Sequence, residues 1–231
     1  MTSTKNIGRL AGLLFLLGAV TSGFYLTYLR SYIIVPGDAA ATVANIKASE
    51  FLFRAAIVSN LFSTMFMFFF GLTMFRLFRE ANKWLATVFV VSIMMTVGLA
   101  VANMLNHFEA LLILSQPDYL RSFSVEQVNA MALTSVRLAN GPGQGLLEVF
   151  WTPYYLSFGL LIYKYRFLPR IIGVFLMMMG VGFAINILDK FLVPQFHPLA
   201  FTRFAMSLGA LGGLPTMFWL LIKGANKPAI E

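Results

Sequence analysis

Residues 84–106 read WLATVFVVSIMMTVGLAVANMLN and carry no charge. A helix needs about 20 mostly apolar residues to cross the hydrocarbon of a bilayer, where only helices and closed barrels satisfy the backbone. None of this chain's apolar runs alternates polar and apolar residues as the strands of a barrel do. The sequence therefore predicts an all-α integral membrane protein, built as a bundle of six transmembrane helices. The predicted spans cover residues 10–29, 52–75, 84–108, 146–163, 171–190 and 203–222 of a single transmembrane domain, 1–231.

The composition agrees with this class. Of the 231 residues, 59% are hydrophobic and 11% are charged, whereas a soluble domain carries roughly 25% charged residues. Disordered proteins, collagens and water-soluble globular enzymes are thereby excluded. The chain has no cysteine, so it forms no disulfide, thiolate nucleophile or Cys-ligated metal site. The net charge of +8 arises from few charges in all, which argues against a nucleic-acid partner.

Basic residues are unevenly divided between the two sides of the predicted membrane. The side with both termini holds ten: Lys5, Arg9, Arg76, Arg79, Lys83, Lys164, Arg166, Arg170, Lys223 and Lys227. The other side holds seven: Arg30, Lys47, Arg54, Arg121, Arg137, Lys190 and Arg203. Because Lys and Arg accumulate on the cytoplasmic side, we expect a multi-pass protein of the cytoplasmic (plasma) membrane with both termini in the cytoplasm. The first run is longer than the apolar core of a signal peptide, so we expect it to be retained as a span.

Two outer connections carry signals for short helices. Asp38 is placed to cap a helix that runs to about Glu50. Ser124 and Gln127 have the spacing of a capping box, which predicts a second helix to about Asn140. The sequence Gly-Pro-Gly at 141–143 then predicts a break before the fourth span.

A six-residue pattern occurs twice. The third span ends in NMLNHF at 103–108 and the fifth in NILDKF at 186–191. One interpretation is a fold of three related hairpins, in which each return helix has one arginine near its outer end (Arg54, Arg137 and Arg203). The other is chance similarity at a membrane interface.

The stretch VPGDAAATVANIKASEFLFR at 35–54 resembles an uncharacterised family of bacterial polytopic membrane proteins, catalogued as domain of unknown function 4386. FLPRIIGV at 167–174 and FSVEQ at 123–127 also fit, and the likeness covers roughly residues 8–219. Family members often have a histidine near the position of Asn140 and lack the Gly-Pro-Gly interruption. The resemblance implies a polytopic membrane protein and supplies no established activity or catalytic residues.

Polar residues gather near the outer ends of the predicted spans, and ionisable groups at membrane depth usually face a cavity or pair with one another. We therefore expect an outer-facing polar vestibule, with Asp189 paired to one of the three arginines. The alternative is that these side chains lie at the headgroup level. The candidate residues are Arg54, Asn60, Asn103, Asn106, His107, Glu109, Arg137, Glu148, Asn186, Asp189, Lys190 and Arg203.

The sequence contains no strong motif for a catalytic site or a cofactor. No two histidines share a helix at metal-ligand spacing, and a haem held by two histidines would need His107 together with His197 in a proline-bounded loop. GxSxG, Walker and dinucleotide motifs are absent. We expect no cofactor, no metal and no catalytic residues.

Three functions stay open at this point. The first is binding or transport of a small polar or amphipathic molecule through the vestibule. Pro153 in the fourth span and Pro215 in the sixth are compatible with it, because broken helices accompany transport sites. The alternative, which we favour for these prolines and for Gly209–Gly213, is a role in helix packing. The second is a non-catalytic membrane module or partner subunit that docks another membrane protein, or a second copy, through its outer helices. The third is an intramembrane enzyme. In each case the lipid bilayer is a partner.

Overall fold

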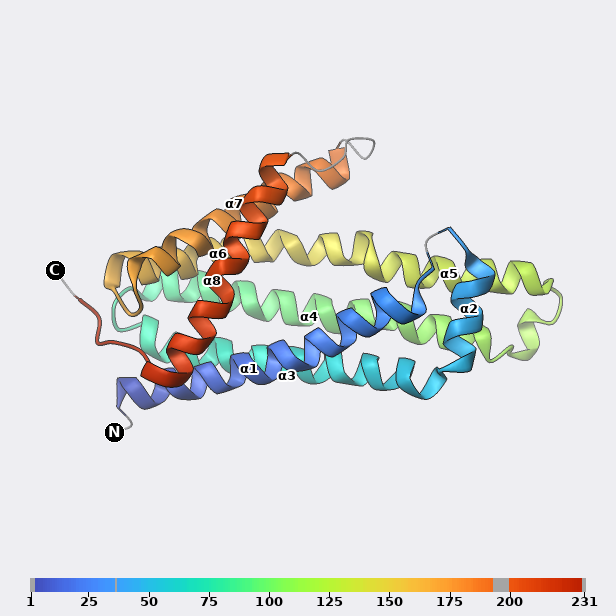
Figure 1. Cartoon of the computed structure of the whole chain (residues 1–231), viewed down its shortest axis with the longest axis horizontal. Helices are drawn as coiled ribbons and strands as arrows, with labels where there is room; N and C mark the ends of the chain where they lie inside the picture. Colours follow the sequence, from blue (N-terminus) through green and yellow to red (C-terminus); the bar gives the residue numbers. More distant parts are fainter. Residues whose placement is uncertain (1–2, 36, 193–199, 230–231) are drawn as a thin grey trace. The chain divides into compact units, whose positions relative to one another are not determined.

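The computed structural model describes residues 3–35, 37–192 and 200–229. These residues form eight α-helices, joined in places by the π-helical turn η1 (Leu29–Ile33) and the 3-10 turn η2 (Asp118–Leu120). The described residues contain no strand, which confirms the all-α prediction. The helices are α1 (Thr4–Tyr28), α2 (Ala39–Ala48), α3 (Glu50–Phe78), α4 (Lys83–Leu114), α5 (Val125–Asn140), α6 (Pro142–Tyr165), α7 (Arg170–Leu192) and α8 (Ala200–Lys223) (Figure 1).

Among the described residues, five helical segments are long and apolar enough to cross a membrane: Thr4–Ile33, Glu50–Phe78, Lys83–Leu114, Val125–Tyr165 and Arg170–Leu192. The sixth predicted span coincides with α8, and among the described side chains of that helix the apolar segment is Leu211–Lys223. The membrane class is therefore confirmed, whereas the count of six is not confirmed in full.

The chain divides into two compact units. Unit 1 comprises Met1–Leu17, Met65–Gly98 and Gly145–Glu231, and unit 2 comprises Gly18–Thr64 and Leu99–Gln144. Helices α1, α3, α4 and α6 contribute residues to both units. The single transmembrane domain expected from the sequence stays a prediction.

The core of unit 1 is aromatic. The ring of Phe78 lies 5.2 Å from that of Phe89 and 5.0 Å from that of Phe167, between ring centroids. Beside this core, α6 and α7 approach closely, because a Cβ built on Gly159 would lie 2.5 Å from the carbonyl oxygen of Gly173. Small residues allow such contacts where lipid, rather than water, surrounds the helices. Helix α7 also packs against α8 (Figure 1).

Unit 2 holds the two short helices predicted from their caps. Asp38 accepts a hydrogen bond from the backbone nitrogen of Ala41 at 2.9 Å and caps α2. Ser124 and Gln127 form the reciprocal capping box of α5. Gly141 ends α5 and α6 begins at Pro142. All three local predictions are confirmed, and α2 packs against α5.

Candidate functional site

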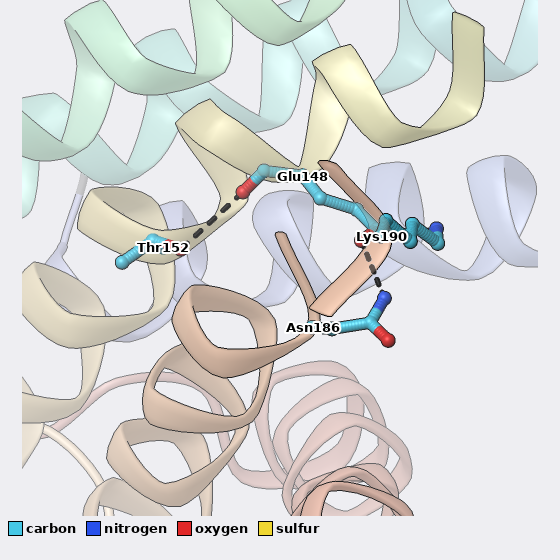
Figure 2. A network of polar contacts seen from close by, with 4 residues as sticks. All are labelled: Glu148, Thr152, Asn186 and Lys190. Atoms are coloured by element: carbon cyan, nitrogen blue, oxygen red, sulfur yellow. Dashed lines mark hydrogen bonds and ion pairs between the residues drawn. The ribbon is translucent and has the colours of Figure 1, made fainter. Parts of the chain in front are cut away.

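Glu148 of α6 is a buried carboxylate with both oxygens engaged by α7. Its Oε1 accepts a hydrogen bond from Lys190 Nζ at 2.6 Å, and its Oε2 accepts one from Asn186 Nδ2 at 2.6 Å. Figure 2 shows the bond from Asn186 to the carboxylate, with Lys190 beside the end of the Glu148 side chain. Asn186 and Lys190 are four residues apart, so they lie on the same face of the helix. These three residues are called the Glu148 cluster below.

The two charges of this cluster differ in exposure. The Glu148 side chain is 5% exposed, whereas that of Lys190 is 37% exposed. A carboxylate in a medium of low polarity is costly unless it is paired and hydrogen-bonded, and Lys190 and Asn186 meet both needs. The Glu148 carboxylate is therefore enclosed, whereas the Lys190 side chain is partly accessible.

Neighbouring residues explain why the helices fit together here. Gly145 lies one turn before Glu148, and a Cβ at this position would lie 3.1 Å from the ring of Phe191. One turn after Glu148, the ring of Trp151 meets that of Phe183 edge to face, with 4.9 Å between the ring centroids. The ring of Tyr155 stacks on Phe183, with 5.5 Å between the centroids. The polar cluster thus borders an aromatic contact between the same two helices.

His107 of α4 is the most buried of the candidate residues in unit 2. It is fully buried, and its Nε2 lies 3.2 Å from the hydroxyl of Tyr25. The ring of Phe53 packs beside it at 6.0 Å between centroids. Within the described part of the chain His107 Nδ1 has no hydrogen-bond partner. The His107–Tyr25 contact joins α4 to α1 inside an otherwise apolar cluster.

Asn103, one turn before His107, ties α4 to the end of α5. Its Nδ2 donates to the carbonyl oxygen of Ala139 at 2.9 Å, and its Oδ1 accepts from Asn106 Nδ2 at 3.0 Å. Gly143 lies so close that a Cβ there would collide with the Asn103 carboxamide. Asn103 therefore has a structural role at the helix break.

The remaining candidates are dispersed over the two units. Arg54 pairs with Glu50 at 2.8 Å on the surface of α3, and Asn60 Nδ2 lies 3.3 Å from the sulfur of Met104. Glu109 and Arg137 are exposed. Among the side chains that the structure describes, Asp189 forms no ion pair. The side chain of Arg203 and the whole of His197 lie outside the described residues.

The structure thus brings together three of the predicted site residues, Glu148, Asn186 and Lys190, in unit 1. It links Asn103 with Asn106, and His107 with Tyr25, in unit 2. A vestibule lined by both sets stays a prediction. Sequence reasoning did not find the Glu148–Lys190 pair, although Glu148 interrupts an apolar run and Lys190 follows Asn186 by one turn. In the described residues no group of three or more His, Asp or Glu is placed to hold a metal ion.

Comparison with known proteins places the chain in a family. A family model described as a domain of unknown function, DUF4386, matches residues 10–224. No curated protein and no solved structure matches the chain. The matched residues include parts of both units and every candidate residue described above. The chain is therefore a membrane protein that belongs to the DUF4386 family.

Proposed function

We propose that the protein binds or transports a small polar or amphipathic molecule at the Glu148 cluster. The observation that carries this proposal is the ion pair of the buried Glu148 carboxylate with the partly exposed Lys190, within helices that are apolar enough to span a membrane. A buried ion pair is a weak source of stability, and apolar residues of similar size often replace one without loss. Ionisable residues at membrane depth are therefore functional candidates by default.

The greater exposure of Lys190 supports the idea that a ligand reaches the cluster at the lysine. An ammonium group can donate three hydrogen bonds, and within the described residues Glu148 is the one hydrogen-bond acceptor of Lys190. An incoming carboxylate, phosphate or carbonyl oxygen can bind Lys190 while Asn186 continues to hold Glu148. The adjacent Trp151, Phe183 and Tyr155 rings supply an apolar contact for the rest of an amphipathic molecule.

The proposed orientation has the Glu148 cluster on the outer side of the plasma membrane, with both termini in the cytoplasm. The ten-to-seven division of basic residues supports this orientation. Glu148 lies 16 residues before Lys164 on α6, which corresponds to about 24 Å along a helix axis. That distance is close to the thickness of the hydrocarbon core, about 30 Å, so the two residues belong near opposite faces.

A ligand screen by thermal shift tests the proposal. The protein in detergent is heated with small carboxylates, amines, phosphate esters and neutral amphiphiles, because a molecule that binds the native state raises Tm. We expect one class to raise the Tm of the wild type and of Asp189→Asn, but not that of Lys190→Gln. If no class does so, or if Lys190→Gln responds equally, the proposal is wrong.

A second candidate function is a partner subunit or a homo-oligomer that docks through its outer helices. It is favoured by the capped helices α2 and α5, which pack together outside the predicted spans. The mass of the purified protein in detergent tests the homo-oligomer. Cross-linking in native membranes, from a single cysteine at the exposed position Gln127, tests for another membrane protein.

A further inference from the structure

The ten basic residues on the side of the termini all belong to unit 1, at or near the ends of its helices. They flank the start of α1, the turn between α3 and α4, the turn between α6 and α7, and the end of α8. Within the described residues, Glu80 is the one acidic residue in these segments. This set of residues is called the basic end below.

Hydrogen bonds hold these segments together. Asn82 in the α3–α4 turn donates to the hydroxyl of Tyr165 at the end of α6, at 3.1 Å. The backbone nitrogen of Asn226, after α8, donates to the carbonyl oxygen of Phe167 in the α6–α7 turn, at 3.0 Å. Arg9 of α1 donates to the carbonyl oxygen of Ile222 in α8, at 3.1 Å. The charges are thus gathered on one surface, and Figure 1 shows the two turns and the end of α8 at the same end of unit 1.

Three cations of the basic end lie over aromatic rings. The ammonium of Lys223 is 4.3 Å from the centre of the Trp219 ring, and the ammonium of Lys164 is 5.6 Å from that of Tyr165. The guanidinium of Arg170 lies 5.4 Å from the ring of Tyr163. Aromatic residues with adjacent cations are typical of the boundary between hydrocarbon and lipid headgroups.

Exposed apolar side chains follow or precede the cations in the sequence. Trp84 follows Lys83 and is 74% exposed, and Ile222 precedes Lys223 and is 64% exposed. Ile171, which follows Arg170, is 56% exposed. A molecule on this surface would meet cations and hydrocarbon side by side, which is the chemistry of a phospholipid with an anionic headgroup.

We propose that the basic end binds anionic phospholipids, with phosphate groups on its lysines and arginines and acyl chains on Trp84, Ile171 and Ile222. Charge complementarity favours this occupant over a zwitterionic lipid, which offers each cation a phosphate together with a competing ammonium. Attraction of this kind weakens as salt rises, because ions screen exposed charges.

Native mass spectrometry of the protein in neutral detergent tests the proposal, with phosphatidylglycerol and phosphatidylcholine of identical chains as probes. Phosphatidylglycerol should be retained preferentially, and 0.5 M salt should reduce the preference. In the triple variant Lys83→Gln, Lys164→Gln and Lys223→Gln, binding should weaken at least about tenfold. The triple variant with Arg at these positions should bind as the wild type does. So should Lys47→Gln with Arg121→Gln, which removes two charges from unit 2.

Equal retention of the two lipids, or an unchanged preference in the Gln variant, would overturn the proposal. Soluble glycerol phosphate separates a lipid surface from a site for free phosphate. Glycerol phosphate lacks acyl chains, so at the same concentration as the lipid it should not displace phosphatidylglycerol from the protein. Displacement would identify a soluble-anion site instead. The salt dependence uses the wild type alone, so a variant that fails to fold leaves the test intact.

Discussion

Lys190 Nζ lies 2.6 Å from Glu148 Oε1, yet the lysine side chain is 37% exposed and the glutamate side chain 5%. Removal of Lys190 and removal of Glu148 should therefore change the stability of the protein by different amounts. An unpaired Lys190 can turn its ammonium toward more polar surroundings, whereas an unpaired Glu148 stays buried with Asn186 as its remaining partner. Loss of the lysine should therefore cost more stability than neutralisation of the glutamate.

Lys190→Ala should destabilise the protein more than Glu148→Gln does. The lysine variant leaves a buried unpaired carboxylate, at a cost of about 3–5 kcal/mol. The glutamine variant keeps a hydrogen-bonding side chain of the same size and should cost about 1–2 kcal/mol. Thermal unfolding in detergent measures both, and Asp189→Asn is the control with little expected effect. Equal losses would contradict the asymmetry.

Tyr25→Phe should destabilise unit 2 through His107. The substitution removes the hydroxyl beside Nε2 and leaves a fully buried ring nitrogen without that partner, which costs about 1–3 kcal/mol. Tyr32→Phe is the matched control, because Tyr32 is 68% exposed. Hydrogen exchange of α4 near His107 should accelerate in Tyr25→Phe and stay unchanged in Tyr32→Phe. The prediction is wrong if the two variants behave alike.

Gly143→Ala should loosen the junction of α5 and α6. The new methyl group would collide with the Asn103 carboxamide and disturb its bond to Ala139, a loss of about 1–3 kcal/mol. Gly98→Ala is the control: it lies in α4 with open space around its Cβ position, so it should stabilise the helix by up to about 1 kcal/mol. Thermal unfolding distinguishes the two, and a neutral Gly143→Ala would contradict the contact.

Asp38→Ala should weaken α2 by about 0.5–2 kcal/mol, because it removes the acceptor for the backbone nitrogen of Ala41. Hydrogen exchange over Ala39–Ala48 should accelerate. Asp38→Asn retains a capping oxygen and should preserve most of the protection. Unchanged exchange in the alanine variant would show that packing of α2 on α5 maintains the helix without its cap.

Reporter fusions test the proposed orientation. A fusion after residue 231 should report the cytoplasm, and one at residue 117, between α4 and α5, should report the outer side. The expectation follows from the division of basic residues. The same side for both fusions would contradict the orientation.

Local signals in the sequence were sufficient for the elements that depend on neighbours in the chain. Asp38 and Ser124 lie three residues from the groups that they cap, so the pattern alone identifies α2 and α5. The long apolar runs likewise identify the membrane helices, since length and composition determine whether a segment can cross lipid. The sixth span stays a prediction, because the apolar segment found among the described side chains of α8 is Leu211–Lys223.

The pairing of Glu148 with Lys190 depends on information that is not local. The two residues are 42 positions apart in the sequence and belong to different helices. Whether Glu148 faces Lys190 depends on the rotation of α6 against α7. That rotation follows from the close contact of Gly159 with Gly173 and of Gly180 with Leu156. The sequence shows these glycines without showing that they meet.

The contact between Gly159 and Gly173 also makes the α6–α7 hairpin a lever. The Gly173 carbonyl oxygen and the Met177 side chain both lie within 3 Å of the Cβ position of Gly159, so sliding of the helices would be opposed at this point and a change in their angle would be easier. Glu148 lies 11 residues from Gly159, or about 16 Å of helix. A splay of about 10° at the pivot would move the ion pair apart by about 3 Å, which is enough to break both hydrogen bonds. A small angular change at the glycines would thereby open the Glu148 cluster, provided that the contacts of Leu156 with Gly180 and of Trp151 with Phe183 gave way as well.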